Sequence, residues 1–293
     1  MIVDCHTHID FSADDAGVSE HLAAAETVDV CFVLGRGQGS SEEVNKRLAE
    51  YVEKHKAKMV GFAVVNPPND KVGLANVRPI QEKLGLEGAV LYCSASGFHP
   101  THTRAMRFYE SAAELGMPVF FHNWEAVSAS EAILEYAQPY LLDEVARSFP
   151  ELKMIIGGMG VPFMEQTFAL VAKHANVYAD LTVKPSSVWQ VYNTVVAANE
   201  RGVMAKLLFG SGFPLGRAQQ CIETLLGFNK LLADTSLPTV PRDRIRTIVE
   251  RETLKVLGIG GGIAEAAAAE RIESVAVRQR RIDEIGEPDL VDN

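Results

Sequence analysis

Residues 2–8 read IVDCHTH, an apolar start followed by a histidine pair, and this pattern predicts a short β-strand. Because side chains alternate along a strand, we expect Asp4, His6 and His8 to share one face. Neutral imidazole is a common zinc ligand, so two imidazoles at one strand end can bind one ion. The stretch predicts half of a metal site; the alternative is a pair of surface histidines near the N-terminus.

Apolar runs recur along the chain after this opening strand, and helical segments separate them. Further strands are expected at residues 28–34, 58–66, 86–93, 119–122, 153–157, 176–181 and 206–210. Such alternation requires parallel strands joined by crossover helices. Eight such units match the size of an α/β fold of the (β/α)8 TIM-barrel type. The structural alternative is an open doubly wound sheet, whose first turn often carries a glycine-rich dinucleotide motif that is absent here.

The composition changes after the last expected barrel helix. We expect a barrel domain over residues 1–257, followed over residues 258–293 by a Gly-rich link and a C-terminal helical extension. The extension is rich in Ala, Glu and Arg and carries no site chemistry. We expect it to pack on the barrel or on a second subunit, which would make the protein a homo-oligomer.

Charge and cysteine content narrow the class of protein. The chain of 293 residues has a formal net charge of −10, which argues against a nucleic-acid or anionic-membrane surface. Its four cysteines lie far apart without a CxxC motif, as suits a reducing compartment. No signal peptide and no apolar run of membrane-spanning length is visible. These features predict a cytoplasmic protein whose partner is a small-molecule substrate.

A barrel places its functional groups where the strands end, at the C-terminal face. His122 ends the fifth strand there, so we expect it to join His6 and His8 around one ion. Arg36 follows the second strand and can bind a substrate carboxylate through two parallel hydrogen bonds; its alternative is a solvated turn residue. Asp180 ends the seventh strand as a candidate base or substrate-orienting group, the alternative being a carboxylate that caps the next turn.

Two further residues are candidates because they follow strand ends. His99 lies in the loop after the fourth strand and can supply a replacement base, although exposed loop histidines are common. Trp124 follows His122 closely and is a candidate substrate contact.

Five phrases at or near the strands occur in a recognisable order. They are DCHTHID at 4–10, PVFFH at 118–122, FPELKMII at 149–156, NVYAD at 176–180 and LFGSGFP at 208–214. Together they resemble the metal-dependent amidohydrolase superfamily, specifically its amidohydrolase-2 (aminocarboxymuconate-semialdehyde decarboxylase-like) branch. The resemblance spans residues 1–257 and implies one divalent metal ion, with zinc expected, bound by His6, His8 and His122.

The chain departs from that family pattern at two positions. Members usually carry a histidine after the sixth strand and an aspartate after the eighth, where this chain has Gly158 and Gly212. A lysine that some members carry on the fourth strand, near Val90 here, is absent as well. In the family the aspartate binds the metal and accepts a proton from its water. Loss of a general base typically costs about 10²–10⁴-fold in rate.

Two hypotheses of different classes follow. The first is a metal-dependent hydrolase-like enzyme that acts on a small organic substrate through a metal-activated water, by C–O or C–N hydrolysis or by decarboxylation. Asp180 or His99 would transfer the proton in that reaction. The alternative is a catalytically degenerate amidohydrolase barrel that serves as a ligand-binding or assembly subunit.

Overall fold

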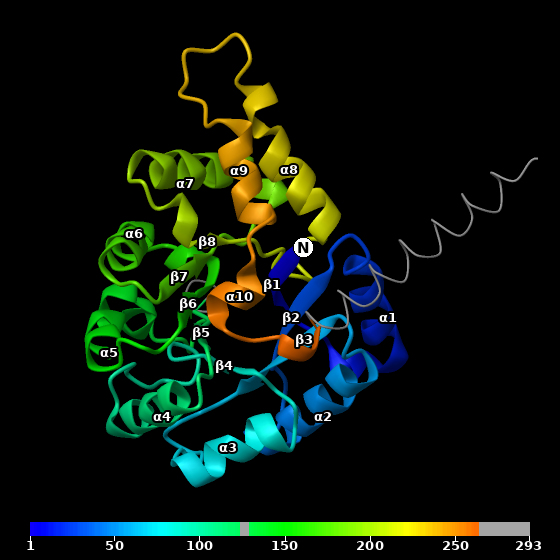
Figure 1. The fold of residues 1–293 in the computed structure, drawn as a ribbon, viewed down its shortest axis with the longest axis vertical. Coiled ribbons are helices and arrows are strands. Elements are labelled where there is room, and N and C mark those ends of the chain that lie inside the picture. Colours follow the sequence, from blue (N-terminus) through cyan, green and yellow to red (C-terminus); the bar gives the residue numbers. More distant parts are fainter. Residues whose placement is uncertain (124–128, 264–293) are drawn as a thin grey trace, which may run out of the picture.

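The computed structural model describes residues 1–123 and 129–263, which form a barrel of parallel strands in the order β1 to β8 (Figure 1). The strands are β1 (Val3–Thr7), β2 (Val30–Leu34), β3 (Met59–Val64), β4 (Gly88–Leu91), β5 (Val119–Phe121), β6 (Met154–Ile156), β7 (Val177–Asp180) and β8 (Leu207–Leu208). Each strand pairs in parallel with the next. The predicted TIM barrel is confirmed.

The barrel is closed by backbone hydrogen bonds between β1 and the segment that follows β8. The amide of Cys5 donates to the carbonyl of Phe209 at 2.9 Å, and the amide of His8 donates to that of Phe213 at 3.0 Å. In the opposite direction, the amide of Gly212 donates to the carbonyl of His6 at 2.9 Å. These bonds fix the backbone of the histidine pair against the end of the eighth strand.

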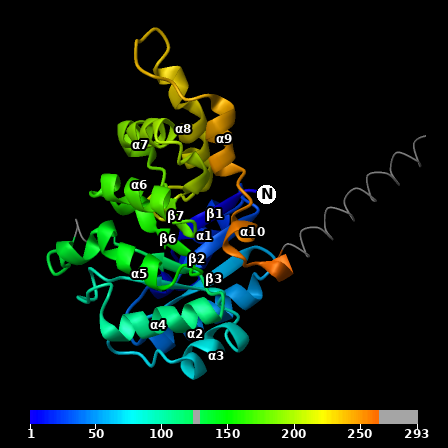
Figure 2. The same cartoon turned by 60° about the vertical axis from the view of Figure 1, so that its left-hand side comes forward.

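Helices cover the outside of the strands in both views (Figures 1 and 2). They are α1 (Asp14–Ala24), α2 (Ser41–Lys54), α3 (Leu74–Glu82), α4 (Thr103–Glu114), α5 (Leu142–Ser148), α6 (Met164–Lys173), α7 (Val188–Glu200), α8 (Ala218–Leu231), α9 (Arg242–Val249) and α10 (Thr253–Leu257). The start of α2 illustrates the local signals: Ser40 caps the helix by accepting from the amide of Glu43, whose carboxylate accepts from the amide of Ser40.

Residues 242–257 form two helices, α9 and α10, with a break between them. The helix is interrupted between α9 and α10, where the Arg251 guanidinium donates to the carbonyls of Leu207 at 2.9 Å and Met204 at 3.0 Å. These hydrogen bonds tie the break to the barrel wall, which a helical sequence pattern does not reveal. At the other end of the chain, α1 begins at Asp14, within the polar segment that follows β1.

Two apolar cores lie on the two faces of the barrel wall. Alternate residues of β2 belong to different cores: Phe32 packs inside the barrel, whereas Cys31 and Val33 pack between the wall and the helices. Leu254 and Leu257 of α10 join the inner core, and α10 lies in front of the strands in Figure 1. This short helix therefore covers one end of the barrel interior.

The segment expected to be a Gly-rich link begins with packed residues. Ile259 and Ile263 belong to the inner core, and the amide of Gly260 donates to the Glu87 carboxylate at 2.5 Å. The expected tail helix lies outside the described residues. None of the helices in the described ranges is both long and apolar enough to cross a membrane. All four cysteines are free and buried.

A β-bulge in β1 decides which side chains enter the barrel. Asp4 pairs with Cys31 but Thr7 pairs with Val33, so β1 contains one residue more than β2 over this interval. Asp4 and Thr7 consequently face the outer side, and His6 and His8 face inward. The expectation that Asp4 shares the face of the two histidines is wrong, because strict alternation does not hold across a bulge.

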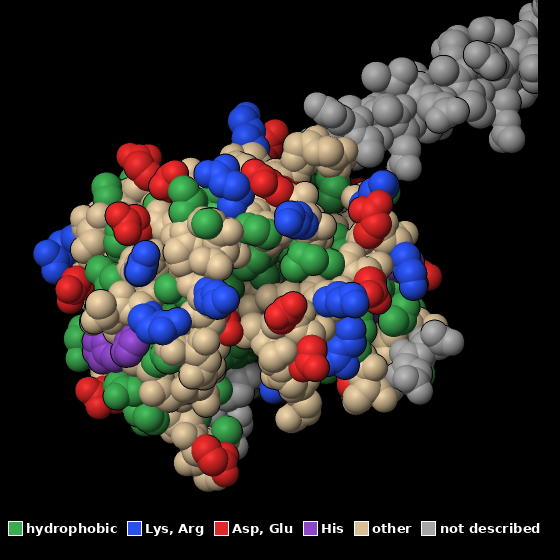
Figure 3. All heavy atoms as spheres, turned by 90° about the horizontal axis from the view of Figure 1, so that it is seen from below, with side chains coloured by type: hydrophobic (Ala, Val, Ile, Leu, Met, Phe, Trp, Pro, Cys, Tyr) green, Lys and Arg blue, Asp and Glu red, His purple; other side chains and the backbone are tan. Residues whose placement is uncertain are grey.

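The molecular surface carries charges of both signs. On the face shown in Figure 3, acidic and basic side chains are interspersed, and they do not form a continuous basic patch on that face.

Candidate metal centre

Three imidazole rings meet at the C-terminal end of the barrel. His6 and His8 come from the end of β1, and His122 directly follows β5; one ring nitrogen from each lies within 4.8 Å of the others. The Nε2 atoms of His8 and His122 are 3.2 Å apart. The three side chains are buried, with at most 7% of each residue exposed. The structure therefore brings together the three histidines predicted to bind a metal.

In both His6 and His8, the Nδ1 atom contacts a hydrogen-bond acceptor that sets the orientation of the ring. Nδ1 of His6 lies 2.6 Å from a carboxylate oxygen of Asp180, and Nδ1 of His8 lies 3.2 Å from the carbonyl of Leu34. Both contacts place a proton on Nδ1 and leave Nε2 as a lone-pair donor. Four ligands at about 2.0–2.1 Å around a tetrahedral zinc lie about 3.3 Å from one another. The 3.2 Å between Nε2 of His8 and Nε2 of His122 matches that spacing, and His6 offers a third nitrogen within 4.8 Å.

Asp180 is fully buried behind the ring of His6. Besides the ring, its carboxylate accepts from the amide of Gly158 at 3.0 Å, from the amide of Thr182 at 2.9 Å and from the Thr182 hydroxyl. Burial alone would raise the pKa of this carboxyl, but the charge and hydrogen bond of His6 and the other donors hold it below its usual value. Asp180 thus reaches the histidine cluster through His6, and its predicted catalytic role stays a prediction.

The environment of His8 favours its neutral form. Burial, followed by the nearby His122, His6 and Arg36, lowers the pKa of His8 well below the ordinary value. A histidine must be neutral at the coordinating nitrogen to bind a metal, so this environment suits a ligand.

Asp4 supports the backbone of the site rather than a ring. Its carboxylate accepts from the amide of His6 at 3.2 Å and from the amide of Ser211 at 2.9 Å. Burial raises its pKa to about 6, against the opposing effect of the Ser211 hydrogen bonds. Asp4 therefore satisfies an amide within the bulge and ties β1 to the end of β8.

The two glycines at the departures from the family pattern have left-handed backbones. Gly158 has φ +54° and Gly212 has φ +65°. A Cβ atom on Gly212 would lie 2.8 Å from Cγ2 of Thr182, closer than side chains pack. The local backbone thus disfavours the aspartate that the family usually carries at this position.

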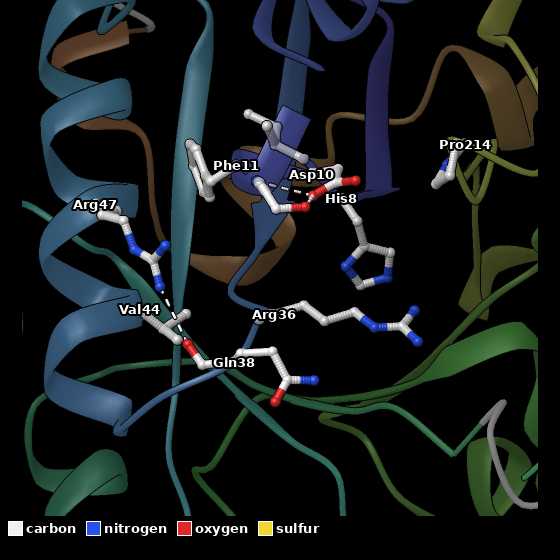
Figure 4. A pocket seen from close by; sticks show the side chains of 11 residues that line it. His8, Asp10, Phe11, Arg36, Gln38, Val44, Arg47 and Pro214 are labelled. Atoms are coloured by element: carbon white, nitrogen blue, oxygen red, sulfur yellow. Dashed lines mark hydrogen bonds between the residues drawn. The ribbon is translucent and has the colours of Figure 1, made fainter. Parts of the chain in front are cut away.

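A pocket of about 440 Å³ opens beside His8 (Figure 4). His8, Asp10, Phe11, Arg36, Arg47 and Pro214 are among the residues that line it. The side chain of Arg36 extends alongside the ring of His8 in Figure 4. Arg47 of α2 lies on another wall and donates to the carbonyl of Gln38 at 3.1 Å. The pocket is large enough for a small organic molecule, and its two guanidinium groups favour an acidic one.

The structure does not bring His99 into this cluster. Nδ1 of His99 accepts from the amide of Thr101 at 3.1 Å, and its ring packs against Tyr136 in the loop after β4. The predicted role of His99 as a base therefore gains no geometric support. Trp124, predicted to contact substrate, lies outside the described residues.

Thr182 and Arg47 belong to the site but were not predicted from the sequence. Thr182 lies two residues after Asp180, a spacing that could have indicated a shared direction at the end of β7. Arg47 gives no such signal, because an arginine on an exposed helix is ordinarily solvated. Its place in the pocket depends on how α2 packs against β3.

Structural relatives share this fold at low sequence identity. A probable 2-pyrone-4,6-dicarboxylic acid hydrolase from Acinetobacter baumannii, solved with citric acid, has a TM-score of 0.61 at 14% identity, covering 88% of this chain and 99% of its own. An uncharacterized TIM-barrel protein from Bordetella bronchiseptica has a TM-score of 0.64 at 16% identity, with coverages of 89% and 99%. A manganese-bound 5-carboxyvanillate decarboxylase from Novosphingobium aromaticivorans has a TM-score of 0.62 at 10% identity, with coverages of 88% and 97%.

Sequence comparison identifies the family. No curated protein matches the chain, but the sequence model of the family Amidohydro_2, described as amidohydrolase, matches residues 3–236. The expected enzyme class, hydrolysis or decarboxylation, agrees with this family and with the named relatives. Because the match covers most of its length, the chain belongs to the Amidohydro_2 family of amidohydrolases.

Proposed function

We propose that this protein is a metal-dependent enzyme that hydrolyses or decarboxylates a small organic acid. The observation that carries the proposal is the convergence of three buried imidazoles, two of which are oriented by acceptors on their outer nitrogens. A divalent ion at such a site polarises a bound oxygen and can lower the pKa of bound water to about 7. Zinc is the expected ion, and the manganese in one relative makes manganese the second to test.

The residues around the ligands have separable roles in this proposal. Asp180 holds the Nδ1 proton of His6 and keeps Nε2 directed at the ion. Arg36, beside His8 in the pocket, binds and orients a substrate carboxylate. Asp10 lies on the pocket wall and can accept a proton from the reacting groups, a task that the family assigns to the missing aspartate.

Metal content tests the first step of the proposal. Protein loaded with zinc or manganese and then desalted should retain about one ion per chain, measured by elemental mass spectrometry. A His6→Ala/His8→Ala variant should retain almost none, whereas His102→Asn, a change at an exposed histidine, should behave like the unmodified protein. Failure of the unmodified protein to retain an ion, or equal retention by the double variant, would contradict a histidine-bound metal.

Substrate orientation by Arg36 is tested with a panel of lactones, amides and aromatic carboxylic acids. For any substrate that turns over, Arg36→Met should raise KM by about 10-fold or more, and Arg36→Lys should recover part of the loss through its charge. An unchanged KM in Arg36→Met would remove Arg36 from the substrate site.

The degenerate barrel remains a distinct second candidate because a specific observation favours it. The backbone at Gly212 disfavours the usual aspartate, so the general base of the family is lost. This candidate predicts that acidic ligands from the same panel raise the melting temperature without being converted. Robust turnover by the unmodified protein would end it.

A cytoplasmic location and a homo-oligomer formed through the tail are further parts of our proposal, the second testable by light scattering.

A further inference from the structure

Thr182 has a backbone conformation that a threonine rarely adopts. Its φ is +40°, in the left-handed region, where a β-branched side chain is crowded against its own backbone. The residue is 6% exposed, so solvent does not stabilise the conformation. Strain of this kind persists only where neighbouring contacts enforce it, and it concentrates at functional sites.

The contacts that enforce this conformation all belong to the metal-centre side of β7. The Thr182 amide donates to Oδ1 of Asp180 at 2.9 Å, and its hydroxyl donates to Oδ2 of the same carboxylate. Its hydroxyl oxygen also lies 2.9 Å from Nδ1 of His6, the nitrogen that Asp180 contacts at 2.6 Å. The hydroxyl therefore shares the His6 proton with the carboxylate and fixes that carboxylate at the same time.

The methyl group of Thr182 occupies the space that a side chain at position 212 would need. An added Cβ on Gly212 would lie 2.8 Å from Cγ2 of Thr182, with no other atom within 4 Å. Gly212 is tied in place because its amide donates to the carbonyl of His6. The two positions are thus packed as a complementary pair beside a metal-binding histidine.

We propose that Thr182 is a positioning residue for His6 and that it acts as a pair with Gly212. Its hydroxyl is a second acceptor, beside Asp180, for Nδ1 of His6. Its methyl group fills the volume that a side chain at position 212 would occupy. The ring of His6 is consequently supported from the end of β7, whereas the segment after β8 supports its backbone. This inference rests on the proposed function, since a bound ion is what gives the ring orientation its purpose.

Metal affinity separates the hydroxyl from the methyl group. Thr182→Val keeps the shape and loses the hydroxyl, and it should weaken zinc binding by about 10–100-fold, the usual effect of removing a partner of a ligating histidine. Thr182→Ser keeps the hydroxyl and should bind within about threefold of the unmodified protein. Affinities are measured by competition with a chromophoric chelator, and circular dichroism confirms that each variant is folded.

A second readout covers the case in which Thr182→Val folds poorly. The visible absorption spectrum of the cobalt(II)-substituted protein reports ligand geometry, and Thr182→Ser should reproduce the spectrum of the unmodified protein. Two results would overturn the role of Thr182 and leave the proposed function intact. One is that the unmodified protein and folded Thr182→Val bind zinc with equal affinity; the other is a changed cobalt spectrum in Thr182→Ser. Failure of the unmodified protein to bind any ion would overturn the proposed function and this inference with it.

Discussion

Asp180 is the residue on which the polar contacts of the site converge. Four residues donate to its carboxylate: Cys5 and His6 from β1, Gly158 from the turn after β6, and Thr182 from the end of β7. A neutral amide at this position cannot accept from all of them, because its NH2 group faces donors. The charge of Asp180 therefore holds together three strand ends that are distant in sequence.

Replacing Asp180 with asparagine should weaken zinc binding by about 10–100-fold, because the amide reproduces the shape of the carboxylate but not its charge or acceptors. Chelator competition measures the effect. Asp143→Asn is the matched control, since Asp143 pairs with Lys173 on the outer helices. Equal losses in both variants would mean that the effect is general destabilisation instead of ligand orientation.

The Thr182–Gly212 pair predicts a non-additive double mutant. Gly212→Ala should destabilise the fold by about 1–3 kcal/mol, through its left-handed backbone and the close approach to the threonine methyl group. In a Thr182→Ser background the methyl group is absent, so part of that cost should disappear. Urea unfolding of the four proteins gives the coupling; additivity within about 0.5 kcal/mol would contradict direct packing of the pair.

At the scale of elements, buried His21 joins α1 to its neighbours. Its Nδ1 lies 2.8 Å from the hydroxyl of Tyr51 on α2, and its Nε2 lies 2.8 Å from the hydroxyl of Thr7 on β1. A single histidine after Ser19 and Glu20 carries no sequence signal of such burial. Its burial arises from the packing of α1 on the outer face of the bulged strand.

His21 should make the fold sensitive to acid. Burial, with His55 nearby, lowers its pKa from 6.5 to about 4, so the unfolded chain binds this proton more readily than the folded one. The contribution is intact above pH 6.5, and up to about 3 kcal/mol is lost as the pH falls to 4. In urea unfolding between pH 7 and 4, His21→Gln should lose less stability than the unmodified protein. His102→Asn is the control, and parallel losses in all three proteins would refute this assignment.

Helix α10 should contribute strongly to stability despite its five residues. Leu254 is 5% exposed within the inner core, so Leu254→Ala should cost about 2–5 kcal/mol by leaving a cavity. Leu237→Ala provides a control at a leucine that is 42% exposed, with an expected change within about 0.5 kcal/mol. Thermal or urea unfolding measures both; a small effect at Leu254 would mean that the barrel end does not depend on α10.

The elements of the barrel were largely predictable, because buried parallel strands read as continuous apolar runs such as residues 28–34. Details that depend on partners were not. The bulge arises from the pairing of β1 with β2, and the break before α10 coincides with hydrogen bonds of Arg251 to the barrel wall. Among site residues, the histidines follow from strand ends. For Thr182 the sequence offers only its two-residue spacing from Asp180, and its contact with His6 depends on the fold.

At the scale of the whole molecule, metal binding should be linked to global stability. An ion that binds only the folded chain stabilises it by about 2.7 kcal/mol when its free concentration is 100 times Kd. Zinc should therefore raise the melting temperature, and a chelator should reverse the rise. His122→Ala should abolish the response, because it removes a ligand from β5. A zinc-dependent shift that persists in this variant would locate binding elsewhere in the molecule.

The bulge in β1 also acts as a phase shift between two periodic patterns in one strand. A pattern of period two has only two phases, and the extra residue changes one into the other between Asp4 and Thr7. The residues before the bulge can follow the alternation of the barrel core, while the residues after it follow the alternation that directs His6 and His8 inward. Substitutions below the shift can therefore tune packing without re-aiming His6 and His8. In a regular strand the same histidines would face inward only if Val3 left the core and Asp4 entered it.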